Sequence, residues 1–162
     1  MLQGHLNNSF LYSPSLVTLD LSFNQLYGSI AKWIDRLSSL KYLILKNNSF
    51  EGKEETIPFT TKNVSYLYEG KVLTYMSGID LSCNKLTGEI PYQIGFLTRI
   101  HTLNLSRNNL TGSIPMTFSH LQQIESLDLS YNNLNGKIPP QLVGLYTLSF
   151  FMWHTITYRQ DS

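Results

Sequence analysis

The sequence predicts a single repeat solenoid of the α/β class, in which stacked coils share one parallel β-sheet. Three observations predict this fold. An apolar position recurs at intervals of 24 residues, it opens the pattern apolar-x-x-apolar-x-Leu-x-x-Asn in five copies, and most copies continue into Leu-x-Gly-x-Ile-Pro. The chain is 42% apolar and 14% charged, a composition that suits one folded domain and excludes a disordered tail.

Each repeat is expected to contribute one short strand. Leu16 and Leu40 share the 24-residue interval, and so do Met76, Ile100, Ile124 and Leu148. The Leu-x-Leu segment has a period of two, so both leucines face the core while the residue between them faces outward. A coil cannot bury its leucines alone, and stacked neighbours form a continuous core. We therefore expect a right-handed solenoid with strands near residues 18–22, 42–46, 78–82, 102–106 and 126–130.

A repeated asparagine follows each predicted strand, where the chain turns inward. Its side-chain amide both donates and accepts hydrogen bonds, so it suits backbone groups that the turn leaves unpaired. We therefore predict a structural role for this set and no ligand contact. The members of this asparagine ladder are Asn24, Asn48, Asn84, Asn108 and Asn132.

The segment after the ladder carries a glycine for a tight bend and a proline with fixed φ, as in Gly88 and Pro91. The full pattern, L-x-x-L-x-L-S-x-N-x-L-x-G-x-I-P, resembles the plant-specific class of leucine-rich repeats. This resemblance implies a concave parallel sheet, short second strands, and 3-10 or loop segments on the convex side.

The period breaks between Leu40 and Met76, which are 36 residues apart. The run from Phe59 to Pro91 resembles the end of the island segment, and the repeats after it, in plant leucine-rich-repeat receptor-like proteins. We therefore expect repeats in 1–52, the first partial, an island-like insertion in 53–75, and four C-terminal repeats in 76–162, the last degenerate. A degenerate coil with an insertion is the alternative. The family continues into a cap, a transmembrane helix and a cytoplasmic tail, so a truncated product is expected.

Several functions are excluded or unsupported. A net charge of +1 without a basic run argues against nucleic acid. Catalysis, a metal site and a cofactor are not expected, because the single cysteine and four histidines form no ligand spacing and no nucleotide or nucleophile motif occurs. The chain start lacks the pattern of a signal peptide, and the apolar stretch 142–153 is shorter than the roughly 20 residues of a membrane span.

Outward strand positions are expected to line a concave binding face, and Phe23, Arg107 and Tyr131 share one column of it. Aromatic residues and arginine often anchor protein interfaces, although an ordinary solvated face is the alternative. The proposed face comprises Thr18, Asp20, Phe23, Tyr42, Ile44, Asn47, Gly78, Asp80, Cys83, Thr102, Asn104, Arg107, Ser126, Asp128 and Tyr131. Tyr66, Tyr68 and Tyr75 are candidate contacts in the insertion. Candidate N-glycosylation sites are Asn7, Asn47, Asn63, Asn104 and Asn109.

Three functional hypotheses follow. The resemblance implies a fragment of the extracellular part of a plasma-membrane receptor-like protein, which binds a protein, peptide or glycan ligand and recruits a co-receptor kinase in defence or development. The first alternative is a soluble apoplastic binding protein, similar to the polygalacturonase inhibitors. The second is a truncated product without independent activity.

Overall fold

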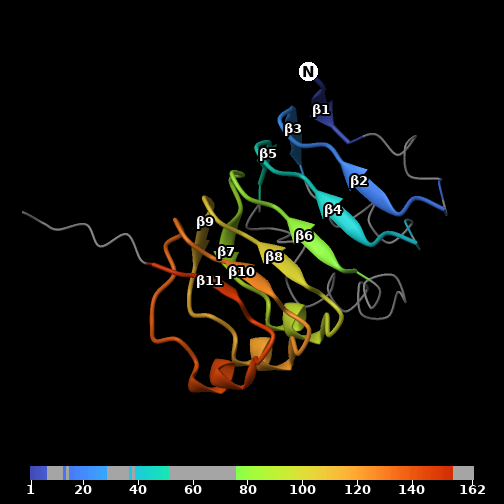
Figure 1. The fold of residues 1–162 in the computed structure, drawn as a ribbon. Helices are drawn as coiled ribbons and strands as arrows, with labels where there is room; N and C mark the ends of the chain where they lie inside the picture. Colours follow the sequence, from blue (N-terminus) through green and yellow to red (C-terminus); the bar gives the residue numbers. More distant parts are fainter. Residues whose placement is uncertain (7–12, 14, 29–36, 38, 52–75, 155–162) are drawn as a thin grey trace, which may run out of the picture.

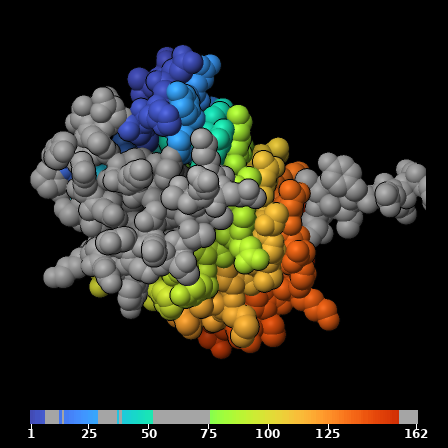
Figure 2. Space-filling model, turned by 180° about the vertical axis from the view of Figure 1, so that it is seen from behind, coloured from blue at the N-terminus to red at the C-terminus, as the bar shows by residue number. Residues whose placement is uncertain are grey.

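A computed structural model describes residues 1–6, 13, 15–28, 37, 39–51 and 76–154. Its coils stack into a solenoid in chain order, and from behind they form successive coloured bands (Figures 1 and 2). Six parallel strands make the concave sheet, in the order β11-β10-β8-β6-β4-β2. They are β2 (Thr18–Asp20), β4 (Tyr42–Ile44), β6 (Gly78–Asp80), β8 (Thr102–Asn104), β10 (Ser126–Asp128) and β11 (Phe150–Met152).

The strands are shorter than the sequence predicts, but the hydrogen bonds between coils continue beyond them. Past the end of β8, the Leu105 N–H donates to the Asp128 carbonyl and the Arg107 N–H to the Ser130 carbonyl, each at 2.9 Å. Bonds at the same two positions link the coils of β2, β4 and β6. The coils of β2, β4, β6 and β8 are therefore each joined to the next coil as far as the residue before the ladder asparagine.

Short second strands lie on the far side of the coils of β2, β4, β6 and β8, as the repeat class implies. One parallel set is β1 (Gln3–His5), β3 (Gln25–Gly28) and β5 (Ser49–Phe50), and another pairs β7 (Thr87–Glu89) with β9 (Asn109–Thr111). The repeated glycine bends the chain here with a positive φ, for example 85° at Gly88 and 74° at Gly112, which glycine adopts without strain.

In the described part of the chain, three 3-10 helices lie on the convex side (Figure 1). They are η3 (Tyr92–Phe96), η4 (Met116–His120) and η5 (Pro140–Gly144). Each follows the motif proline, whose ring holds φ near the value that a helix entry needs, from −64° at Pro91 to −56° at Pro139. Apolar residues from strands and helices fill the space between, with Leu103 1% and Phe118 0% exposed.

The long interval between the second and third described coils does not interrupt the concave sheet. β4 pairs directly with β6, Tyr42 opposite Gly78 and Ile44 opposite Asp80. Glu51 bridges to Lys85 just before the gap in the described residues. The predicted insertion, 53–75, lies outside the described residues, together with Tyr66, Tyr68, Tyr75 and Asn63, so its limits remain a prediction.

Candidate recognition surface

The ladder asparagines hold the coils together from inside. Asn108 accepts a hydrogen bond from the Leu86 N–H at 3.0 Å, and its Nδ2 donates to the carbonyls of Leu81 and Leu105 at 3.0 Å. Asn48, Asn84 and Asn132 make equivalent bonds, and all four are at most 9% exposed. Asn24 is less buried but bonds its own turn in the same way. These amides are used by the backbone and are closed to a ligand.

Three carboxylates of the predicted concave face also stabilise the turns that follow their strands. Oδ1 of Asp80 and of Asp128 accepts the N–H of the serine two residues later, at 2.9 and 3.0 Å. Asp20 forms the same turn, and the Ser22 hydroxyl and then its N–H hold the pKa of Asp20 below its usual value, against a small opposing effect of burial. These carboxylates stay half-exposed or exposed, but one oxygen of each is committed to a turn.

The first column of the face begins each strand. Thr18, Tyr42 and Thr102 are exposed, and Ser126 is half-buried. Gly78 corrects the prediction: it is buried, because the Tyr42 ring lies over it and a Cβ built on Gly78 would come within 2.9 Å of Tyr42 Cδ1. The Tyr42 ring therefore covers the Gly78 position, which we expected to be an open part of the binding face.

A separate set, which we call the lateral column, comprises the residue before each ladder asparagine: Phe23, Asn47, Cys83, Arg107 and Tyr131. All five have φ of 54° or 55°, the left-handed region, although none is glycine. The repeated turn imposes this backbone, and the N–H of the first four bonds to a carbonyl of the next coil. Four of these side chains are exposed and Cys83 is half-buried, so the column projects from a rigid edge.

Cations and rings pair at both ends of the lateral column. Arg107 Cζ lies 4.3 Å from the centroid of the Tyr131 ring, and Tyr131 meets the His154 ring edge to face at 4.5 Å. At the other end, Lys46 Nζ lies 5.9 Å from the Phe23 centroid. The sequence pattern did not predict Lys46 or His154 as members of the recognition surface. Each replaces the serine that other coils have at this position, and this departure from the repeat could have identified them.

The repeat geometry agrees with comparisons to known proteins. A family profile described as "Leucine rich repeat" matches residues 74–134 and 98–150, and a second, "Leucine Rich Repeat", matches residues 15–37. A chain of the BIR3–SERK2 complex from Arabidopsis thaliana superimposes with a TM-score of 0.66 at 32% identity, over 86% of this chain and 70% of that one. The chain belongs to the plant leucine-rich-repeat proteins.

Within that family, this leucine-rich-repeat chain is of the receptor-like type. Receptor like protein 22 of Arabidopsis thaliana is 41% identical over 103 residues, which cover 56% of this chain and 13% of that protein. The Arabidopsis receptor kinase HAESA, solved with the peptide hormone IDA and the co-receptor SERK1, gives a TM-score of 0.76 at 31% identity, over 90% of this chain and 22% of that one. The chain spans between 4% and 13% of the length of the curated relatives it matches.

Three of the candidate glycosylation sites lie in described residues, whereas Asn7 and Asn63 do not. Asn109 is exposed on β9, and Asn47 belongs to the lateral column. Asn104 lies in the concave sheet, and its Oδ1 accepts both the N–H and the hydroxyl of Ser106, the serine of its own sequon. A glycan on Asn104 would therefore stand in the middle of the proposed binding face.

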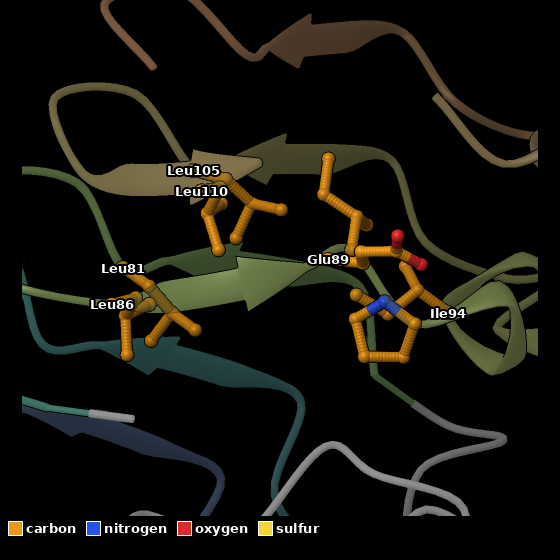
Figure 3. A pocket seen from close by; sticks show the side chains of 8 residues that line it. Leu81, Leu86, Glu89, Ile94, Leu105 and Leu110 are labelled. Atoms are coloured by element: carbon orange, nitrogen blue, oxygen red, sulfur yellow. The ribbon is translucent and has the colours of Figure 1, made fainter. Parts of the chain in front are cut away.

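An apolar hollow opens between the coils of β6 and β8, but it belongs to the core (Figure 3). Its volume is about 20 Å³, and Leu81, Leu86, Ile90, Leu105 and Leu110 are among the residues that line it. This is roughly the space of one water molecule. Elsewhere in the described part of the chain, no three His, Cys, Asp or Glu side chains gather as metal ligands, and no helix is long and apolar enough to cross a membrane.

Proposed function

We propose that this chain is the recognition module of a plant cell-surface receptor-like protein, and that its lateral column and concave sheet bind a protein, peptide or glycan ligand on the extracellular side of the plasma membrane. The parent protein would pair with a co-receptor kinase for defence or developmental signalling. The similarity to receptor-like proteins, and to a receptor kinase solved with a peptide hormone and a co-receptor, supports this proposal.

The observation that carries the proposal is the choice of side chains in the lateral column. A left-handed backbone costs a residue with a Cβ about 1 kcal/mol or more, so the fold alone would favour glycine there. The chain instead places Phe23, Arg107 and Tyr131 at three of these positions, with Phe23 58% and Tyr131 42% exposed. Rigid aromatic side chains and arginine are the types that most often anchor an interface.

The same backbone provides a test that separates binding from folding. Replacing Phe23, Arg107 and Tyr131 together by glycine removes the side chains at positions where glycine is unstrained. Each substitution should change the free energy of unfolding by no more than about 1 kcal/mol, because relief of the left-handed strain offsets the larger entropy of the unfolded chain. The matched control is Tyr92→Ala, which removes an exposed ring, 52% accessible, from η3 on the convex side.

The probes are a phage library of random dodecapeptides and an array of cell-wall oligosaccharides, each applied to the 162-residue chain. We expect binders that are lost with the triple glycine variant and retained with Tyr92→Ala, while both variants stay folded and unfold cooperatively above the temperature of the binding assay. Binders whose affinity is unchanged for the triple glycine variant, or is lost with Tyr92→Ala instead, would contradict the proposal.

A further inference from the structure

The lateral column ends in a preorganised arginine. Cζ of Arg107 lies over the Tyr131 ring, 4.3 Å from its centroid, and the His154 ring meets the same ring edge to face, with centroids 4.5 Å apart and an interplanar angle of 80°. The three residues come from three successive coils, whose backbones are joined by hydrogen bonds such as that from the Arg107 N–H to the Ser130 carbonyl. The side chain of Arg107 is therefore fixed by a ring on one side and by a rigid turn beneath it.

A guanidinium that contacts a ring through its face keeps its N–H donors available, because they point outward in the plane of the group. Within the described part of the chain, no carboxylate lies at ion-pair distance from Arg107. Asp128, on the neighbouring coil, is turned toward Ser130, whose N–H and hydroxyl its Oδ1 accepts at 3.0 and 2.7 Å. The arginine thus presents a set of donors that the described residues leave open for an outside acceptor.

We propose that Arg107, positioned by Tyr131, binds a carboxylate of the ligand, contributed by an Asp or Glu side chain or by a chain terminus. The inference rests on the proposed function and names the chemistry of one part of its surface. A planar carboxylate matches the fork of a guanidinium with two parallel hydrogen bonds, and an arginine that is already ordered loses less entropy on binding. Asp80 and Asp128 are half-exposed on the concave sheet and repel a ligand carboxylate from it. The ligand carboxylate is therefore favoured at the lateral column.

Two pairs of variants test this geometry on peptides selected from the dodecapeptide library. Arg107→Gly and Arg107→Lys should both weaken binding at least about tenfold, since lysine keeps the charge but lacks the planar fork. Tyr131→Leu should weaken binding about two- to fivefold by removing the stacking ring, whereas Tyr131→Phe should restore it. Loss of binding in Tyr131→Phe, or full binding in Arg107→Gly, would overturn the proposal.

The peptides themselves identify the source of the carboxylate. In each selected peptide, every Asp or Glu is changed to its amide, and the C-terminus is amidated separately. One of these changes should reduce the affinity for the parent chain as much as Arg107→Gly does. The same change should not reduce the affinity for the Arg107→Gly variant any further. Peptides without such a carboxylate that still depend on Phe23 would refute this inference and leave the proposed function standing. Peptides that depend on no residue of the lateral column would refute both.

Discussion

Replacing Asn108 by alanine tests how much one ladder amide stabilises the solenoid. The side chain is 6% exposed, accepts the Leu86 N–H at 3.0 Å, and donates to the carbonyls of Leu81, Leu105 and Ser106 at 3.0, 3.0 and 3.2 Å. Alanine removes these bonds and leaves buried backbone groups without partners. At about 1–1.5 kcal/mol for each of roughly three bonds lost, the free energy of unfolding should fall by about 3–5 kcal/mol. For a domain of this size, that corresponds to roughly 10 °C in Tm.

Urea and thermal unfolding followed by circular dichroism measure this loss, with two controls. Asn109→Ala changes the neighbouring side chain, which is exposed on β9, and should cost under about 0.5 kcal/mol. Asn24→Ala should cost less than Asn108→Ala, because Asn24 is only partly buried. Its Oδ1 accepts the Leu2 N–H, but among the described residues its Nδ2 donates only within its own turn, to the Leu21 and Ser22 carbonyls. Equal losses at Asn108 and Asn109 would refute the assignment of the ladder as structural.

Three further predictions concern packing and modification. Gly95→Ala should destabilise the chain by about 1–3 kcal/mol in the same melts, because its Cβ would collide with the Thr117 carbonyl, whereas Gly144→Ala, with no atom within 4 Å, should not. Leu105→Ala should cost about 2–5 kcal/mol and Thr102→Ala little, and equal losses would show that the inward and outward faces are misassigned. Secreted through a plant pathway with an added signal peptide, the chain should carry glycans on several sequons, and peptide mass spectrometry that finds them all unoccupied would count against an extracellular origin.

The concave sheet and the ladder were predictable because they repeat. One hydrophobic period and one turn geometry fix each coil, so five copies of the pattern define strand positions, stacking direction and the buried amides such as Asn84. The final coil, where Phe151 stands in a leucine position, still forms β11, since an aromatic residue fills the same inward site. Periodic burial tolerates this substitution because the neighbouring coil fixes the backbone.

Features that depend on contacts between coils could not be predicted. The left-handed φ of Arg107 has no local signal, since arginine does not favour it; the backbone bonds on both sides of the turn impose it. The burial of Gly78 depends on which way the Tyr42 ring turns, and the pairing of Arg107 with Tyr131 joins residues 24 positions apart in side-chain conformations that no motif encodes. The sequence therefore predicted which positions form the proposed binding surface, but not their backbone conformation or the contacts between their side chains.

Because β4 pairs directly with β6, the structure allows a test of whether the predicted insertion is separable from the solenoid. Glu51 and Met76 enclose residues 52–75, while the equivalent positions of the next coil, Thr87 and Ile100, enclose 88–99, half as many. Replacing 52–75 by a copy of 88–99 would supply an ordinary convex segment with its buried apolar residues. Because a shorter connection also costs less closure entropy, by about 0.6 kcal/mol for a halving, the free energy of unfolding should stay equal or rise.

This replacement also removes Tyr66, Tyr68 and Tyr75, the predicted contacts in the insertion, without touching the lateral column. If these rings bind ligand or co-receptor, the replaced chain in its intact parent receptor should fold normally and lose affinity for one of the two, as should the milder pair Tyr66→Ala and Tyr68→Ala. A folded replacement with unaltered affinity for both would make the segment a spacer. A replacement that unfolds at lower urea than the parent would show instead that 52–75 contributes to the core, and the predicted boundary at 53 would be wrong.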